Sequence, residues 1–197
     1  LVREQSAESL PAGLRPGQAD AALVYGHGRL GADAIRAGGF DTLSTLVNGV
    51  LSLEGGLELD LGLGLRLAAG FIGLREGSEP GAQVRLSAPY VRLAGATRNQ
   101  LDHHIMPFPQ GSLSPGILPG SALTIDGYLI DVIENVRFGT RGSITQASGG
   151  SRAVERDAFD HTTLRSQGDL RFLKSLAADR SKLNVPGDLL LAASQVY

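Results

Sequence analysis

Two pairs of carboxylates are the residues of this chain best suited to acid–base chemistry. Glu58 and Asp60 lie two positions apart, and Asp126 and Asp131 lie five apart. Polysaccharide-cleaving enzymes use two converging carboxylates, one as the acid and one as the base or nucleophile. The Glu58/Asp60 spacing is equally typical of the solvent face of a strand, because alternate residues of a strand share a face. We therefore predict that the chain is not an enzyme, and a β-helical carbohydrate-active enzyme or toxin module is the alternative.

Other polar groups lack the spacing that catalysis or metal binding needs. Asp157, Asp160 and His161 have no Gly-x-Ser-x-Gly element near them that would present a nucleophile. His103 and His104 are adjacent, so their side chains point in different directions and are poorly placed to share a metal ion. The chain contains no Cys, which excludes thiolate zinc sites and cysteine nucleophiles. We predict no catalytic residues, no metal site and no cofactor.

A glycine-rich segment at Gly26–Gly31 matches the dinucleotide-binding pattern G-x-G-x-x-G and follows an apolar run, Ala21–Tyr25. That site requires a helix after the last glycine and an acidic residue about 20 positions further on. Gly38–Gly39 interrupts the helix early, and no alternation of strands and helices follows. A dinucleotide-binding α/β domain is therefore a second alternative only.

The charge balance argues against nucleic acid as a partner. The 18 basic and 20 acidic residues give a net charge of −2, and aromatic residues make up 5% of the chain. Phosphate backbones attract clustered basic residues, and single strands stack on aromatic side chains. Neither feature is present in this sequence, so we predict no nucleic-acid partner.

The strongest structural signal is the alternation of leucine with polar or small residues over Leu57–Leu67. Six leucines occupy every second position there. This period of two places all six on one face of an extended strand. Eleven residues are long for one strand, so we expect a bend near Gly62 or Gly64.

A weaker repeat surrounds four glycines, Gly49, Gly127, Gly168 and Gly187, each flanked by leucine or valine. Their separations of 78, 41 and 19 residues are close to multiples of 19–20 residues. A fixed period of this size is typical of a solenoid. We predict an all-β, right-handed parallel β-helix of 19–20-residue coils with loop insertions, in which these glycines turn the coils. The predicted core columns include Leu51, Leu57, Leu123, Ile125, Leu164, Leu170, Leu183 and Leu189.

The predicted organisation has four parts. Residues 1–33 form an irregular segment or the first coils, and residues 34–101 form β-helix coils. Residues 102–122, rich in Pro and Gly, form a loop insertion that presents any recognition surface. Residues 123–197 form further coils with a polar loop near 149–159. Helical turns are expected only at Asp33–Arg36 and within Leu173–Lys182.

Much of the chain from Ala34 to Tyr197 resembles the filamentous haemagglutinin family, the large exoproteins of bacterial two-partner secretion. The most specific stretch is Phe138–Phe172, with FGTRGSIT at its start and TLRSQGDLRF at its end. The segments AGGFDTL (37–43), LSAPYVRL (86–93) and GDLLLAASQVY (187–197) add to the likeness.

This resemblance implies a structural shaft segment of a secreted, cell-surface adhesin that attaches to host cells or surfaces. Family members cross an outer-membrane two-partner-secretion transporter unfolded and fold outside as a right-handed parallel β-helix. The transporter recognises a region that is not in this sequence, and the receptor would be a host glycan or protein. The start, Leu1–Gln5, lacks an initiator Met and a signal-peptide pattern, which indicates an internal segment.

Overall fold

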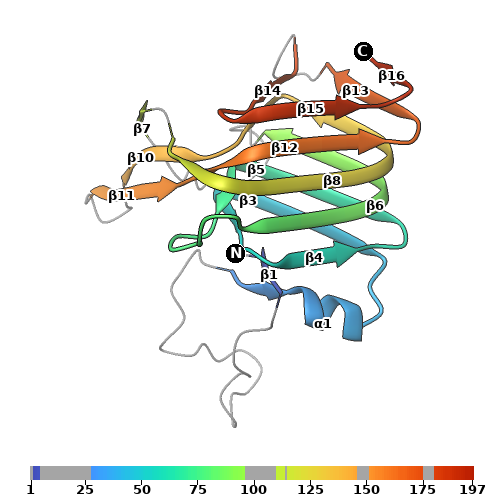
Figure 1. The fold of residues 1–197 in the computed structure, drawn as a ribbon, viewed down its shortest axis with the longest axis horizontal. Helices are drawn as coiled ribbons and strands as arrows, with labels where there is room; N and C mark the ends of the chain where they lie inside the picture. Colours follow the sequence, from blue (N-terminus) through green and yellow to red (C-terminus); the bar gives the residue numbers. More distant parts are fainter. Residues whose placement is uncertain (1, 5–27, 96–109, 114, 146–150, 175–179) are drawn as a thin grey trace.

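The computed structural model describes residues 2–4, 28–95, 110–113, 115–145, 151–174 and 180–197. These residues form sixteen strands and one helix, α1 (Ala32–Ala37). Eleven of the strands belong to one sheet, and every pair within it is parallel. From β3 onward the paired strands follow one another in the order of the sequence, whereas β1 lies between β2 and β3 (Figure 1). The prediction of an all-β fold with parallel strands is confirmed.

The parallel strands pair in three ladders, because the longest strands bend and contribute to two ladders each. The first ladder runs through β4 (Leu57–Asp60), the start of β6 (Gln83–Gly95), β8 (Ile117–Ile133), β12 (Ala158–Ser166) and β15 (Asp188–Ala192). The second ladder runs through β3 (Thr42–Leu53), β5 (Gly64–Leu74), the end of β6, the end of β8, β13 (Asp169–Leu173) and β16 (Gln195–Val196).

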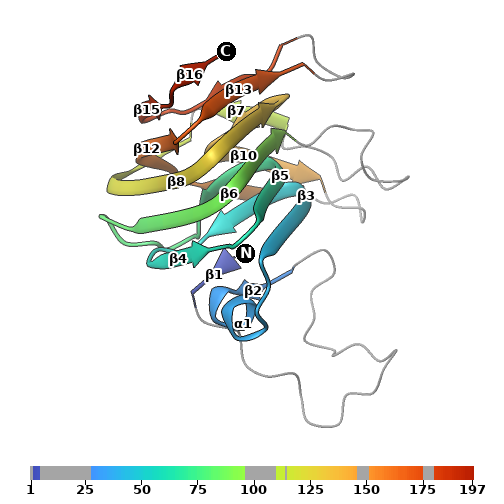
Figure 2. The ribbon, with the colours of Figure 1, turned by 90° about the vertical axis from the view of Figure 1, so that its right-hand side faces the viewer.

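The third ladder is shorter and less regular. It runs through β2 (Leu30–Gly31), β1 (Val2–Arg3), the ends of β3 and β5, and β9 (Asn135–Arg137) with β14 (Lys182–Asn184). An isolated bridge between Ile72 and Phe138 joins its two halves. Figure 2 shows the rungs stacked above α1.

A small antiparallel sheet projects from this stack (Figure 1) and changes two of the predicted loops. It contains β7 (Gln110–Leu113), β10 (Thr140–Thr145) and β11 (Ser151–Arg156). The predicted loop near 149–159 is therefore largely strand. The predicted insertion 102–122 also ends early, because β7 occupies 110–113 and β8 begins at Ile117. Pro119 lies where the β8–β12 register shifts, and its carbonyl accepts a hydrogen bond from Gly81 N–H at 2.9 Å.

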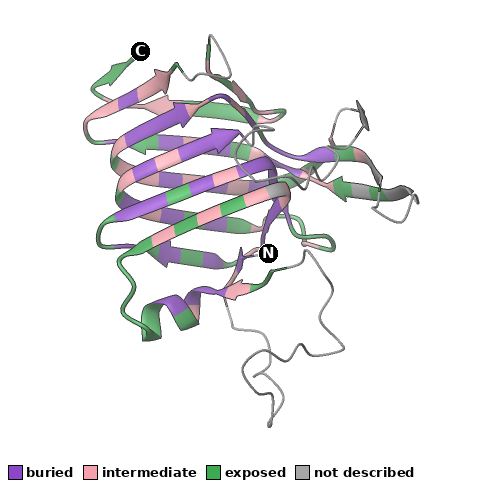
Figure 3. Cartoon of the chain, turned by 180° about the vertical axis from the view of Figure 1, so that it is seen from behind, coloured by how far each residue is buried: buried purple, intermediate pink, exposed green. Residues whose placement is uncertain are grey.

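The apolar residues point into one core between the ladders. Buried and exposed residues alternate along the strands in Figure 3. Over Leu57–Leu67, five of the six leucines are at most 3% exposed, while Leu63 is 64% exposed. Leu63 lies in the predicted bend, between the end of β4 at Asp60 and the start of β5 at Gly64. The bend interrupts the alternation and turns this leucine outward.

The core columns are largely as expected, and the departures lie near the last strands. Leu51, Leu57, Leu123, Ile125, Leu164 and Leu170 are each at most 2% exposed. Leu183 is partly buried against the core, whereas Leu189 is 41% exposed. Leu189 lies on β15, the outermost strand of the first ladder.

The predicted repeat length is wrong. Paired residues are 22 positions apart between Leu43 and Leu65, but 39 apart between Val84 and Leu123. They are 27 apart between Thr162 and Leu189. The segments that join successive strands differ in length, so the spacing along the sequence does not report the period of the stack.

Of the four repeat glycines, Gly168 and Gly187 lie between successive strands, as a role in turning the coils requires. None of the four has a positive φ, and Gly49 and Gly127 lie inside strands. At Gly168 and Gly187, a Cβ atom would lie 2.8 Å from Tyr128 O and 2.4 Å from Asp160 O. These two glycines are required because one strand passes close to the next, and not because the chain turns left-handed there.

The end of the stack nearest the N-terminus is covered. Ala32 and Ile35 of α1 are buried in the core, and Arg36 donates a 2.7 Å hydrogen bond to the carbonyl of Glu58 on β4. Glu4 forms an ion pair with Arg36 and accepts a 3.1 Å hydrogen bond from the Glu58 N–H. These two side chains therefore occupy hydrogen-bonding groups that a neighbouring strand would otherwise take. The same hydrogen bonds, led by that from Arg36, lower the pKa of Glu4 below its usual value of 4.5.

The bend between β4 and β5 supplies a direct test of the core. We expect Leu61→Asp to lower the free energy of unfolding by about 3 kcal/mol or more, because it places a carboxylate where a 3% exposed leucine packs. The matched control is Leu63→Asp, two residues away, which should change stability by less than about 0.5 kcal/mol. Urea unfolding measures both. Equal stability of Leu61→Asp and the wild type would refute the placement of this strand.

The Glu4 contact predicts a specific pH dependence. We expect Glu4→Gln to lower the free energy of unfolding by about 1 kcal/mol at neutral pH. Because the folded-state pKa of Glu4 is lowered, its contribution is complete above the unfolded pKa and is lost as the pH falls through the folded value. The difference between variant and wild type should therefore shrink in acid. Glu79→Gln, at an exposed turn position, is the control, and a pH-independent difference would contradict the assignment.

Candidate functional site

The outer face of the first ladder carries a group of charged residues centred on Asp126, in which the acidic and basic side chains are in contact. Its carboxylate accepts hydrogen bonds from Arg165 on β12, with Nε at 2.7 Å and a terminal nitrogen at 3.0 Å. On the other side, Arg85 on β6 lies 3.3 Å from the same carboxylate. Asp126 thus joins three neighbouring strands, and each arginine in this group has an acidic partner.

The outer face of the second ladder carries a more buried group centred on Asp131, which is 2% exposed. Arg171 on β13 binds both carboxylate oxygens, at 2.7 and 2.9 Å. The hydroxyl of Tyr90 donates to the same carboxylate at 2.9 Å. Burial raises the pKa of the Tyr90 hydroxyl above 10.0, and the hydrogen bond to Asp131 raises it further.

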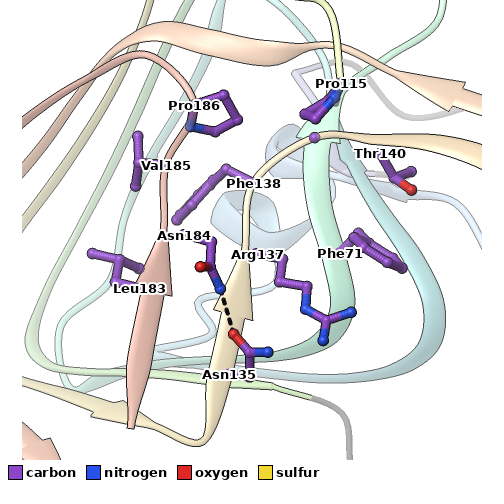
Figure 4. A pocket seen from close by; sticks show the side chains of 11 residues that line it. Phe71, Pro115, Asn135, Arg137, Phe138, Thr140, Leu183, Asn184, Val185 and Pro186 are labelled. Atoms are coloured by element: carbon purple, nitrogen blue, oxygen red, sulfur yellow. Dashed lines mark hydrogen bonds between the residues drawn. The ribbon is translucent and has the colours of Figure 1, made fainter. Parts of the chain in front are cut away.

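A groove of about 670 Å³ lies beside β9 and β14 (Figure 4). Phe71 from β5 and Phe138 form apolar parts of its wall, and both are buried. The guanidinium of Arg137 lies 5.6 Å from the centre of the Phe71 ring. The groove is lined by Phe71, Pro115, Asn135, Arg137, Phe138, Gly139, Thr140, Leu183, Asn184, Val185 and Pro186.

Polar groups in this groove are suited to hydrogen bonding and not to acid–base catalysis. The side chains of Asn135 and Asn184 are hydrogen-bonded to each other across β9 and β14. The hydroxyl of Thr140 is buried without a hydrogen-bond partner. Among the residues that the structure describes, no carboxylate or histidine lines the groove. The amides of Asn135 and Asn184 and the guanidinium of Arg137 can donate hydrogen bonds to a polar ligand.

The structure separates Asp126 from Asp131, whereas Glu58 and Asp60 share the solvent face of β4. Asp126 pairs on the first ladder and Asp131 on the second, and each is bound by arginine. Glu58 points to solvent on β4. Asp60 accepts a hydrogen bond from the hydroxyl of Ser87.

Of the remaining polar candidates, Asp160 and His161 lie next to each other, with an Asp160 carboxylate oxygen 3.9 Å from His161 Nε2, and His103 and His104 lie outside the described residues. Asp160 accepts a 2.8 Å hydrogen bond from the Gly120 N–H, and His161 lies 3.4 Å from Asp188. Asp157 lies beside Gly116 and not beside His161. Among the described residues, no group of three or more acidic, histidine or cysteine side chains is arranged to hold a metal ion.

The glycine-rich segment Gly26–Gly31 does not lead into an α/β domain. Its first two residues lie outside the described ranges, and its last two form β2. A helix does follow at once, but it spans only Ala32–Ala37 and is the single helix of the described chain. The alternation of strands and helices that a dinucleotide-binding domain requires is therefore missing from the part of the chain described.

The groove was not predicted from the sequence. Its residues come from β5, from the adjacent strands β9 and β10, and from β14, three parts of the chain that are far apart in the sequence. The available signal is weak: Asn135 and Asn184 each belong to a strand of only three residues. Only the register of β9 with β14 brings the two amides together.

Comparisons with known proteins identify no relative. No family model, no curated protein and no solved structure matches the chain. Within the described residues, no helix has the length and apolar character needed to cross a membrane.

The Tyr90–Asp131–Arg171 contact predicts a linked change in stability and in titration. We expect Asp131→Asn to lower the free energy of unfolding by about 2 kcal/mol, because Arg171 loses its charged partner. The variant should also lower the pKa of Tyr90 toward 10.0, although burial still holds it above that value. Tyrosinate absorbance, with Tyr90→Phe used to assign the signal, measures the shift. Asp169→Asn, which neutralises the carboxylate that accepts a hydrogen bond from the Tyr197 hydroxyl, is the control. An unchanged Tyr90 pKa in Asp131→Asn would contradict the proposed contact.

Proposed function

We propose that the chain is a segment of a right-handed parallel β-helix that serves as the structural shaft of a secreted adhesin. The observation that supports it most is the continuous parallel pairing from β4 to β15 and from β3 to β16. Each new strand pairs in parallel with a strand of the preceding rung, and the apolar residues of all rungs face one core. Adding further rungs therefore extends the structure into a rod. Right-handed connections between parallel strands are strongly preferred, which supports the handedness.

The adhesin role rests on the resemblance of Ala34–Tyr197 to filamentous haemagglutinin-like exoproteins. The absence of Cys is compatible with passage through an outer-membrane two-partner-secretion transporter as an unfolded chain, because no disulfide can form before export. In this proposal the protein lies on the bacterial cell surface or is released from it. Its receptor is a host glycan or protein.

The first and second ladders supply rigidity, and the groove supplies a surface for recognition. The carboxylates of Asp126 and Asp131 bind arginines on neighbouring strands. They are therefore better suited to stabilising the stacked strands than to acting as the acid and base of a hydrolytic reaction. The alternative of a carbohydrate-active enzyme or toxin module needs two free carboxylates in one groove. The polar groups of the observed groove instead favour binding without chemistry.

Exposure on intact bacteria tests the proposal. In the bacterium that produces the protein, we expect antibodies against this chain to label unbroken cells or to detect the protein in the medium. Inactivation of the outer-membrane transporter should remove the signal outside the cell and leave the protein inside. An antibody against a cytoplasmic enzyme controls for lysis. Detection only after the cells are broken, with a functional transporter, would refute the proposal.

A further inference from the structure

The second ladder carries one column of outward residues in which arginine is in excess. Arg66, Arg92, Asp131 and Arg171 are in-register neighbours on β5, β6, β8 and β13. The residues before and after them, such as Leu65, Leu67, Val91 and Leu93, are buried. All four charged side chains therefore project from the outer face, since side chains alternate along a strand. This column holds three positive charges and one negative charge.

The single carboxylate of the column, that of Asp131, does not neutralise Arg66 or Arg92, because other side chains bind it. Asp131 binds Arg171 through both oxygens and also accepts from Tyr90. Among the described residues, no carboxylate lies within 4.0 Å of the guanidinium of Arg66 or Arg92. Residues in register on adjacent strands are about 5 Å apart at the backbone, and like charges placed there repel.

The first ladder shows that this arrangement is not general in the protein. There, Asp126 lies between Arg85 and Arg165 and contacts both. In the second ladder the position beyond Arg66 is Ser44 and not an acid. Within the described chain, two guanidiniums on neighbouring rungs with no carboxylate partner are thus a particular feature of Arg66 and Arg92.

Tyr90 helps to hold this pair in place. Its ring lies beneath the Arg66 guanidinium, 5.9 Å from the ring centre. The residue in register with Tyr90 on β5 is Gly64, so no side chain stands beside the ring on that strand. Because Asp131 fixes the Tyr90 hydroxyl, the ring is a rigid support for Arg66.

We propose that Arg66 and Arg92 form a binding site for a doubly charged oxyanion, such as a sulfate or phosphate group. Guanidiniums donate paired hydrogen bonds to such groups, and one dianion between the two arginines removes their repulsion. The group can be a free ion or can be carried on a polymer. The site lies on a different face from the groove and does not depend on the adhesin role.

Titration with inorganic sulfate, followed by calorimetry and by the thermal unfolding midpoint, tests the site. We expect saturable binding by the wild type, and an affinity about tenfold lower for Arg66→Gln or Arg92→Gln. Arg85→Gln is the matched control, because it removes the same charge from a paired arginine and should leave the affinity unchanged. Arg66→Lys should restore only part of the affinity, since an ammonium lacks the planar fork. Circular dichroism verifies that each variant is folded.

Dextran sulfate and neutral dextran distinguish the source of the anion. Tighter binding of dextran sulfate than of sulfate, lost in Arg66→Gln, supports the site with a polymer-borne group. Binding of inorganic sulfate alone, with the same loss, supports the site with a free ion. No saturable binding by the folded wild type overturns the proposal. An equal loss of affinity in Arg85→Gln and Arg66→Gln also overturns it, because the attraction would then be a diffuse effect of net charge.

Discussion

Backbone hydrogen bonding between successive parallel strands is the constraint on which the rest of the molecule depends. In a parallel ladder a residue shares its face with the residue paired to it on the next strand. Leu57, Val84 and Leu123 therefore enter the same core column, and Glu58, Arg85 and Thr124 form an outer column beside it. The core requires only an apolar residue at each rung, but the outer columns require charges that match their neighbours.

This constraint explains why the corners and ends of the stack carry unusual residues. At one corner β12 gives way to β13, and Gly168 passes so close to Tyr128 that no side chain fits. At the end nearest the N-terminus, Arg36 and Glu4 replace the missing neighbour of β4 with side-chain hydrogen bonds. At the opposite end β15 exposes Leu189 and Leu190, by 41% and 59%. The two ends thus differ: one is covered by polar and helical elements, and the other presents apolar side chains.

Local patterns predicted the strands well, and long-range geometry could not be predicted from them. The leucine alternation over Leu57–Leu67 indicates a half-buried strand with a bend, because period and burial are properties of neighbouring residues. The 19–20-residue period failed because pairing depends on which segments meet, and the joining segments vary in length. The groove and the Asp131 contact were not predicted for the same reason. Asn135 with Asn184, and Asp131 with Arg171, become neighbours only through the register.

The in-register parallel stack can be measured directly, because the chain has no Cys of its own. Thr124 and Thr163 are paired neighbours on β8 and β12, and Arg165 is two positions out of register with Thr124. A disulfide requires Cα atoms within about 7 Å. The parallel stack predicts that oxidation cross-links the double variant Thr124→Cys/Thr163→Cys without loss of the folded state, and that it does not cross-link Thr124→Cys/Arg165→Cys. Cross-linking of the second pair but not the first would contradict the register, and with it the stacked architecture.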